Sequence, residues 1–239
     1  MSIIVGSARH DENGKYTGGK KGDQLQKNDA HDTKGECSMQ NFYVHTKGWF
    51  ILRPMTKLLA DNLSEAIVTA CNNPKIGYSQ NCQRKTVDDI CTLIPINVDC
   101  SKLVRNCIYH ASHHDVGNFT TASEVAVLEK SGLFKKHFAY KSQSQTPLYN
   151  GDVLVSQTKG HTVIVCSGSP RPADVQYYPK YTGTTTSIVT ALKSVGENDT
   201  SFEHRKKIAG ANGIKLYVGT ANQNTSLLKL LKQGQLVKV

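Results

Sequence analysis

The strongest constraint on the fold is the order of three apolar segments in the middle of the chain. Residues 100–111 carry apolar side chains three, four, seven and eight positions after Cys100, which is one face of an amphipathic helix. Residues 152–155 and 162–166 are short, apolar and rich in β-branched side chains, and the turn at 158–160 joins them, so they predict a buried pair of strands. We therefore expect an α+β domain in which a helix packs on a small antiparallel sheet.

A cysteine and a histidine stand at the ends of these elements. Cys100 opens the helix directly after Asp99, a residue suited to capping the first turn. A cysteine in the first turn lies in the positive field of the helix, which favours the nucleophilic thiolate. His161 begins the second strand, where a rigid sheet can hold an imidazole against the thiol. Taken singly, Cys100 would be interpreted as a structural cysteine and His161 as a solvated residue at a strand end. The occurrence of both motifs in this order predicts a catalytic pair.

The composition limits the classes of partner. The formal net charge is +10, which suits anionic partners such as nucleic acid, membrane surfaces or wall polymers, although dispersed surface lysines explain it equally well. No nucleic-acid motif and no long apolar run is found, so we expect neither nucleic acid nor a membrane as a partner. The N-terminal residues lack a signal-peptide pattern, which predicts synthesis in the cytoplasm.

The cysteine and histidine spacing leaves a metal site open as an alternative. Seven cysteines leave at least one thiol unpaired, and a cytoplasmic origin disfavours disulfides. Cys107, His110 and His114 would share a face of one helix, but no fourth zinc ligand is evident. We expect no metal and no cofactor.

Further elements follow from periodicity. Residues 1–40 are polar and show little periodicity. Residues 41–45 and 48–53 predict two strands. Helices are predicted at three places: 56–72, 85–93 and 121–130.

A compositional break divides the chain into two domains. Residues 169–178 contain two of the seven prolines and are interpreted as a linker between a catalytic domain at 1–168 and a module at 179–239. A Tyr-x-Gly-Thr turn followed by a short helix occurs twice in the module, which suggests duplication. A third helix is predicted at 202–212. The module is therefore expected to be a small helix-rich α/β unit.

The motifs resemble those of a known group of enzymes. Residues 99–101, 151–154 and 160–163 are similar to the nucleophile motif, the preceding strand and the base motif of papain-like cysteine peptidoglycan hydrolases, the group that includes NlpC/P60, CHAP and phage amidase families. Residues 76–80 and Arg84 resemble the Tyr-Ser segment of that group. The whole chain looks most like endolysins of phages that infect Gram-positive bacteria, clostridial ones in particular.

The resemblance implies hydrolysis of an amide bond in peptidoglycan, by an endopeptidase or an N-acetylmuramoyl-L-alanine amidase, and lysis of the host cell. His161 would take the proton of Cys100, and the thiolate would form a thioester that water releases. Backbone N–H groups and Tyr78 would stabilise the oxyanion. The group usually orients its histidine with a third polar residue; here only Asp174 and His45 are candidates, so that residue is unknown.

The resemblance also implies that the C-terminal module binds the cell wall, either through peptidoglycan or through anionic polymers. Tyr181, Arg205, Lys206 and Tyr217 are the candidate wall-binding residues, and the module could instead form a homo-oligomer. The protein would act at the wall after release from the cytoplasm. Three alternatives stay open: an intracellular cysteine amidohydrolase or transferase of the same fold, a non-lytic wall- or nucleic-acid-binding protein in which Cys100 is structural, and a zinc-dependent amidase.

Overall fold

The computed structural model describes residues 2–22, 35–172 and 174–239. The chain divides into two compact units, Met1–Pro172 and Ala173–Val239. Within the described residues, none of the helices combines the length and apolar character needed to span a bilayer.

The first unit is built on an antiparallel sheet of six strands, in the spatial order β2-β1-β8-β7-β3-β6. A separate parallel pair joins β4 to β5. The strands are β1 (Ile4–Ala8), β2 (Cys37–Asn41), β3 (Trp49–Leu52), β4 (Ile76–Tyr78), β5 (Ile96–Val98), β6 (Phe138–Ala139), β7 (Val153–Ser156) and β8 (Thr162–Ser167). The predicted strand pair at 152–155 and 162–166 is confirmed as β7 and β8.

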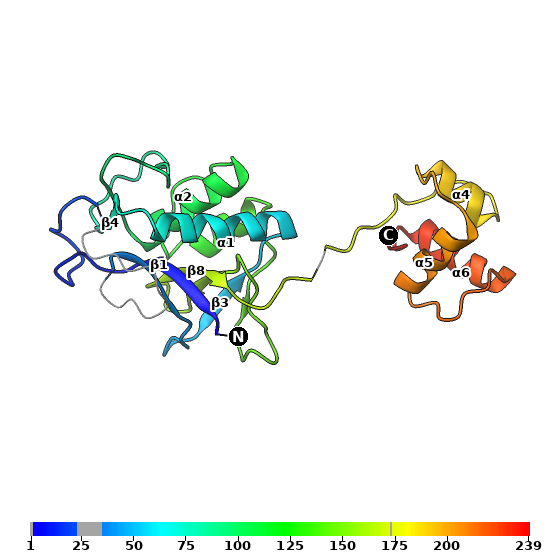
Figure 1. Ribbon diagram of the computed structural model, residues 1–239, viewed down its shortest axis with the longest axis horizontal. Coiled ribbons are helices and arrows are strands. Elements are labelled where there is room, and N and C mark those ends of the chain that lie inside the picture. The colour runs from blue at the N-terminus through cyan, green and yellow to red at the C-terminus, as the bar shows by residue number, and fades with distance from the viewer. Residues whose placement is uncertain (1, 23–34, 173) are drawn as a thin grey trace. The chain divides into compact units, whose positions relative to one another are not determined.

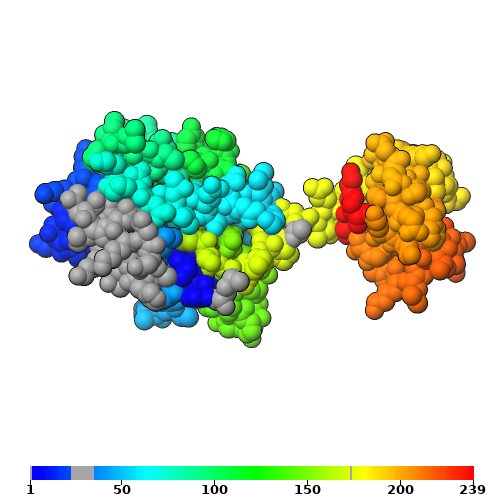
Figure 2. Space-filling view, in the orientation of Figure 1, coloured from blue at the N-terminus to red at the C-terminus, as the bar shows by residue number. Residues whose placement is uncertain are grey.

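Two helices cover one face of this sheet. The helices of the unit are α1 (Lys57–Cys71), α2 (Cys100–Ser112) and α3 (Glu124–Lys130). The helices α1 and α2 lie side by side over β1 and β8 (Figure 1), and their apolar side chains share one buried core with the sheet. In the space-filling view, α1 and the segment before α2 form a continuous surface over this face (Figure 2). The predicted helices at 56–72 and 100–111 are thereby confirmed.

The central strand β1 was missed by the sequence pattern. It lies between β2 and β8 and passes closely beneath α1. A Cβ atom at Gly6 would lie 2.5 Å from Cγ1 of Ile67, so only glycine allows this approach. After Ile4 and Val5, the strand continues with the small residues Gly6, Ser7 and Ala8, so its sequence shows no clear alternation of apolar and polar side chains.

Two predicted elements are wrong. No strand forms over residues 41–45 as predicted. Asn41 is instead the last residue of β2. The helix predicted at 85–93 is an irregular loop. Its backbone is held by side chains of α2, since the N–H of Asp88 donates to Asn106 Oδ1 at 3.0 Å. These external partners replace the hydrogen bonds that a helix would make internally.

The second unit is helical. It contains α4 (Ile188–Ser194), α5 (Phe202–Ala211) and α6 (Ala221–Gln233) around a core of its own. Among its described residues there is no strand beyond a single bridge between Tyr177 and Val237, so the expected α/β character is wrong.

The connection between the units is shorter than the predicted linker. At its start, the N–H of Ser169 donates to Leu148 O in the first unit at 2.9 Å. At its end, Tyr178 is 2% exposed in the core of the second unit.

Candidate active site

A pocket of about 700 Å³ opens at the N-terminal end of α2. Cys100 and His161, the predicted catalytic pair, are 61 residues apart in the sequence, and both line this pocket. Tyr78 lines the same pocket, as do two cationic side chains, Arg9 and Arg84. The structure therefore brings the predicted nucleophile, base and tyrosine to one site.

Cys100 is the first residue of α2, and a buried polar cap fixes its position. The Oδ1 atom of Asp99 accepts the N–H of Lys102 at 2.8 Å, which confirms Asp99 as the N-cap. Asp99 also forms an ion pair with Arg84, which in turn donates to Ser101 Oγ at 3.3 Å. The helix start is thus held from both sides of Cys100.

The surroundings of Cys100 favour the neutral thiol. Burial raises the pKa of Cys100 to about 11, and the nearby Glu124 carboxylate adds to the effect. The backbone N–H groups of Thr162 and Ser101, and the charge of Arg84, act in the opposite direction but do not compensate. The helix start is expected to favour the thiolate, whereas burial at this site acts in the opposite direction.

A buried glutamate next to the nucleophile was missed by sequence reasoning. Glu124 begins α3, is 0% exposed, and accepts the hydroxyl of Thr162 at Oε1 over 2.7 Å. Its Oε2 atom has no hydrogen-bond partner among the described residues. Burial raises the pKa of Glu124 to about 8, so the acid is mostly protonated at neutral pH. One signal was present: Glu124 lies four positions before Leu128, on the face of the helix that points inward.

His161 stands directly before β8, and its backbone N–H donates to Ser156 Oγ at 3.1 Å. The ring lies 6.4 Å from the ring of Trp49, centroid to centroid. Burial, together with the positive charges of Arg9 and His45, lowers the pKa of His161 to about 4. The imidazole is therefore neutral at neutral pH, which is the form that accepts a proton.

The third, orienting residue stays unassigned. Among the described residues, neither ring nitrogen of His161 has a hydrogen bond to protein. His45 packs against Trp49 at 5.2 Å, and its Nδ1 accepts the N–H of Lys47 at 3.1 Å, so it acts on His161 by charge alone. Asp174 belongs to the second unit and does not line the pocket.

Tyr78 lies at the end of β4 with 3% of its surface exposed. Burial, together with the charge of Cys100, raises the pKa of Tyr78 to about 12. The phenol therefore keeps its proton and can donate a hydrogen bond into the pocket.

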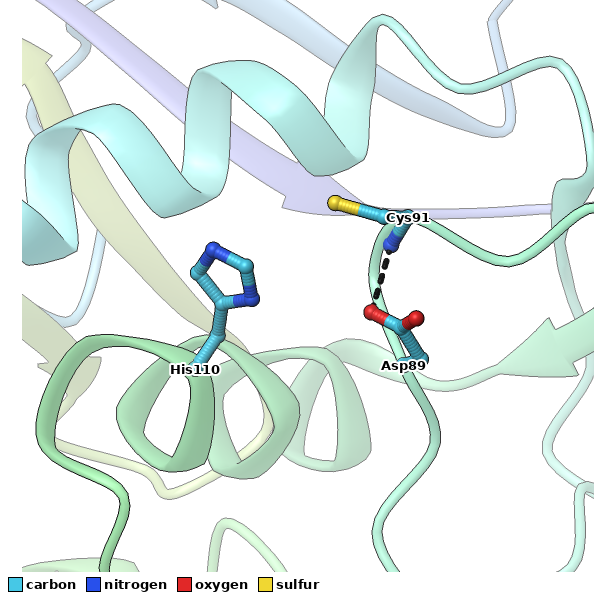
Figure 3. A group of neighbouring side chains, drawn as sticks. All are labelled: Asp89, Cys91 and His110. Carbon is cyan, nitrogen blue, oxygen red and sulfur yellow. Dashed lines mark hydrogen bonds between the residues drawn. The ribbon is translucent and has the colours of Figure 1, made fainter.

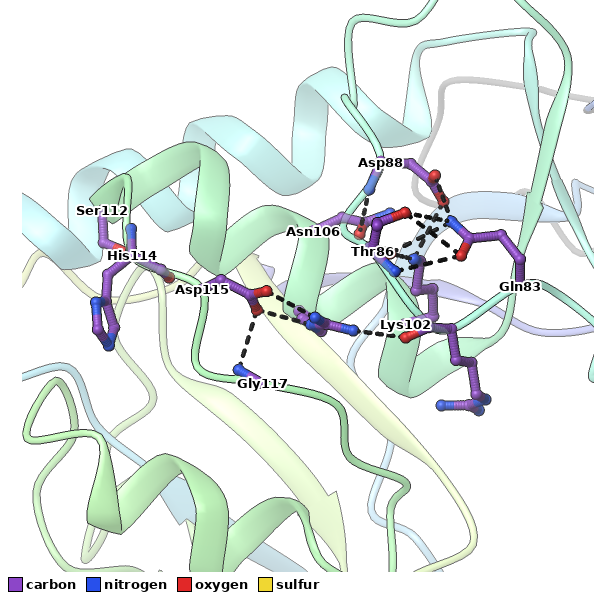
Figure 4. Close-up of polar contacts among 11 residues, drawn as sticks. Gln83, Thr86, Asp88, Lys102, Asn106, Ser112, His114, Asp115 and Gly117 are labelled. Carbon is purple, nitrogen blue, oxygen red and sulfur yellow. Dashed lines mark hydrogen bonds and ion pairs between the residues drawn. The ribbon is translucent and has the colours of Figure 1, made fainter.

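The segment 81–95, which we call the β4–β5 loop, supplies the pocket with Arg84. Side chains of α2 anchor this loop. Arg105 donates to Arg84 O at 2.8 Å, and the buried amine of Lys102 lies 3.3 Å from a carboxylate oxygen of Asp88 (Figure 4). The loop and the nucleophile helix therefore form one connected polar framework.

Comparison with known proteins assigns the segment that contains this site to a family. A family model described as an endolysin-like domain matches residues 5–171. The chain belongs to the family of endolysin-like domains. A stretch of 37 residues is also 60% identical to a Listeria phage A118 protein named L-alanyl-D-glutamate peptidase; it makes up 16% of this chain and only 13% of that relative. No solved structure matches.

The endolysin-like domain does not bring together Cys107, His110 and His114, which the sequence left open as an alternative metal site. Cys107 is fully buried in the core, whereas His110 and His114 are exposed, so the three do not form one site. His110 lies instead near Asp89 and Cys91 of the β4–β5 loop (Figure 3).

Outside the endolysin-like domain, the predicted wall-binding residues fall into two groups. Lys206 and Tyr217 line one groove of about 460 Å³ in the second unit, although Tyr217 is only 4% exposed and offers no open ring face. Tyr181 and Arg205 are half-buried and do not line that groove. The ring of Tyr217 belongs to the core of the unit, which leaves Lys206 as the exposed member of this pair.

Proposed function

We propose that this protein is a phage endolysin that hydrolyses an amide bond in bacterial peptidoglycan, with Cys100 as nucleophile and His161 as base. The main observation in support is that both residues line one pocket within the segment that matches the endolysin-like family. The Listeria phage relative is named for the L-alanyl-D-glutamate bond, so an endopeptidase acting on that bond is the first specificity to test, with the N-acetylmuramoyl-L-alanine amide second.

The resting site holds a thiol and a neutral imidazole, as the two pKa shifts require. A ring nitrogen of His161 takes the thiol proton as the sulfur of Cys100 attacks the amide carbonyl. The resulting oxyanion is placed against the first backbone N–H groups of α2 and the phenol of Tyr78. The amine leaves with the proton from His161 and a thioester remains. Water, deprotonated by His161, then releases the carboxylate and restores the thiol.

In this scheme Glu124 is a positioning residue. Its carboxyl accepts the Thr162 hydroxyl and thereby fixes the strand residue that follows His161. Because the acid is protonated below about pH 8, it does not repel the negative charge that develops on Cys100 during attack. We therefore assign its neutral form to the active enzyme. The papain-like arrangement of helix and sheet belongs to the same proposal.

The second unit is proposed to bind the wall. Residues 174–239 contain nine Lys and Arg against four Asp and Glu, a net charge of +5, which suits anionic wall polymers. The groove lined by Lys206, Lys215 and Tyr217 is the candidate contact surface. A tethered binding unit raises the concentration of the active site at an immobile substrate.

The test is loss of turbidity of purified Gram-positive cell walls, clostridial ones included, with wild type and Cys100→Ala. We expect wild type to clear the walls and the variant only to bind them. Mass spectrometry of the released fragments then identifies the bond: a new N-terminal D-glutamate marks the endopeptidase, and a free lactyl carboxylate marks the amidase. Equal clearing by both proteins would refute the cysteine mechanism.

A further inference from the structure

A second group of polar side chains lies near the other end of α2. Asp89, Cys91 and His110 each offer one ligand atom, and these atoms all lie within 4.8 Å of one another. Figure 3 shows the imidazole rising from α2 beside the two loop residues. All three residues are exposed, and none of them lines the pocket that holds Cys100. The proposed hydrolysis does not use them.

The donor set is selective for a class of metal ion. A thiolate, an imidazole and a carboxylate together favour zinc, whereas calcium and magnesium prefer oxygen ligands alone. Zinc bonds of about 2.0–2.3 Å in tetrahedral geometry place the ligand atoms roughly 3.5 Å apart. The ligand atoms lie up to 4.8 Å apart, so binding requires the three exposed side chains to rotate toward the ion.

The ligand atoms are available. One carboxylate oxygen of Asp89 accepts the backbone N–H of Cys91 at 2.9 Å, which orients the carboxylate toward the thiol residue. Cys91 forms no disulfide. Among the residues that the structure describes, the imidazole of His110 and the second oxygen of Asp89 make no hydrogen bond to protein.

The backbone that carries the ligands is anchored on both sides of Cys91. The amide of Asn73 donates to Ile90 O at 2.9 Å and to Thr92 O at 3.0 Å. Ile90 itself is 0% exposed and packs in the main core. His110 comes from the last turn of α2. Loop and helix are thus fixed independently of any ion, which lowers the entropic cost of binding one.

We propose that Asp89, Cys91 and His110 bind one Zn²⁺ ion, with water in the fourth position, and that the ion links the β4–β5 loop to α2. Binding releases the thiol proton of Cys91 to solvent, because zinc is held by the thiolate. The role is structural: the ion stabilises the loop that carries Arg84. This inference is independent of the proposed hydrolase function.

The experiment uses the full-length protein without a polyhistidine tag. Zn²⁺ binding is measured by calorimetry, and Co²⁺ serves as a spectroscopic probe of thiolate coordination. We expect one ion per chain, a thiolate-to-cobalt charge-transfer band, and a higher melting temperature with Zn²⁺. Cys91→Ala and His110→Ala should each weaken Zn²⁺ affinity by more than about tenfold and abolish the thermal shift.

Two matched variants serve as controls. Cys82→Ala removes another partly exposed thiol of the same loop, and His114→Ala removes an exposed histidine just beyond α2. Both should bind Zn²⁺ like wild type. Circular dichroism confirms folding of each variant, and His110→Gln provides a second test of the imidazole. A cobalt spectrum without the thiolate band, or affinity that survives both Cys91→Ala and His110→Ala, would overturn the proposal, and so would equal loss in His114→Ala.

Discussion

The two ends of helix α2 carry similar chemical groups in opposite surroundings. At the N-terminal end, Cys100 and His161, which directly precedes β8, line a pocket, and the fully buried Glu124 of α3 lies close to Cys100. Near the C-terminal end, a histidine meets a cysteine and an aspartate that are all exposed. The thiol, imidazole and carboxyl types are the same; the access of water differs.

That difference decides which chemistry each end can support. Burial raises the pKa of Cys100 and Glu124 and lowers that of His161, so these three groups rest uncharged and their reactivity depends on substrate. Zinc is bound by a thiolate, a carboxylate and a neutral imidazole, and all three side chains at the exposed end are accessible to an ion from solvent. The same residue types are therefore assigned to catalysis at one end and to metal binding at the other.

The largest expected effect separates the two cysteines. Cys100→Ala should reduce wall hydrolysis by about 10³-fold or more, because no other group replaces the nucleophile. Cys91→Ala should leave the rate within about twofold, since its thiol lies outside the pocket. Initial rates of turbidity loss measure both. Comparable losses from the two substitutions would remove the functional distinction between the helix ends.

Burial of Glu124 predicts a pH-dependent stability. Its pKa rises from the ordinary value of 4.5 to about 8, so between these values the folded protein holds a proton that the unfolded chain releases. Stability from this group is therefore full below pH 4.5 and is lost as pH rises toward 8, by a few kcal/mol. Urea unfolding at pH 5 and pH 8.5 measures it.

The comparison with a neutral side chain isolates that contribution. Glu124→Gln should lose less stability than wild type over this pH interval, whereas the exposed Asp89→Asn should follow wild type at both pH values. A Glu124→Gln protein with the same pH dependence as wild type would show that Glu124 is not the titrating group.

Removing the Glu124 charge should also make Cys100 more reactive. In the ionised form, Glu124 raises the pKa of Cys100. Above pH 8, Glu124→Gln should therefore increase the rate of Cys100 alkylation by iodoacetamide, because the pKa of the thiol falls. Peptide mass spectrometry reports each cysteine separately, and Cys91 in the same sample is the internal control. An unchanged Cys100 rate would exclude electrostatic coupling between the two groups.

A smaller effect is expected for the helix cap. Asp99→Ala removes the hydrogen bond to the Lys102 N–H and the ion pair with Arg84, which should cost about 1–3 kcal/mol of unfolding free energy. The exposed Asp89→Ala should cost less than about 0.5 kcal/mol in metal-free buffer. Denaturant unfolding measures both. Equal costs would mean that the polar framework at the nucleophile end contributes no particular stability.

The sequence predicts the elements whose pattern is strong and local. Helix α2 and the strands β7 and β8 follow from apolar periodicity, and Asp99 follows from its place before the helix. Strand β1 does not, because its short apolar run is interrupted at Gly6 and ends in Ser7 and Ala8, which leaves no clear alternation. The pattern around Asp88 predicts a helix where the structure has a loop. The loop depends on hydrogen bonds to α2, and such tertiary contacts cannot be inferred from local sequence.

The site was predictable only in part, for the same reason. Cys100 and His161 stand at element boundaries that the sequence marks, and the fold brings them together. The role of Glu124 depends on burial beside Thr162, and that is a property of packing between α3 and β8. The trio of Asp89, Cys91 and His110 likewise requires the loop to fold against α2, whereas helical spacing alone grouped His110 with Cys107 and His114.

The smallest expected effect is that of a chelator on wall hydrolysis. Since Cys100 and His161 supply nucleophile and base, and the zinc ligands proposed here lie outside the pocket, EDTA should change the initial rate by less than about twofold. The same treatment should lower the melting temperature of zinc-loaded wild type to that of Cys91→Ala. A thiol-alkylating reagent in a parallel assay should abolish hydrolysis. If EDTA abolishes hydrolysis and alkylation of Cys100 does not, the exposed end of α2 holds the catalytic centre and the assignment of the two ends is reversed.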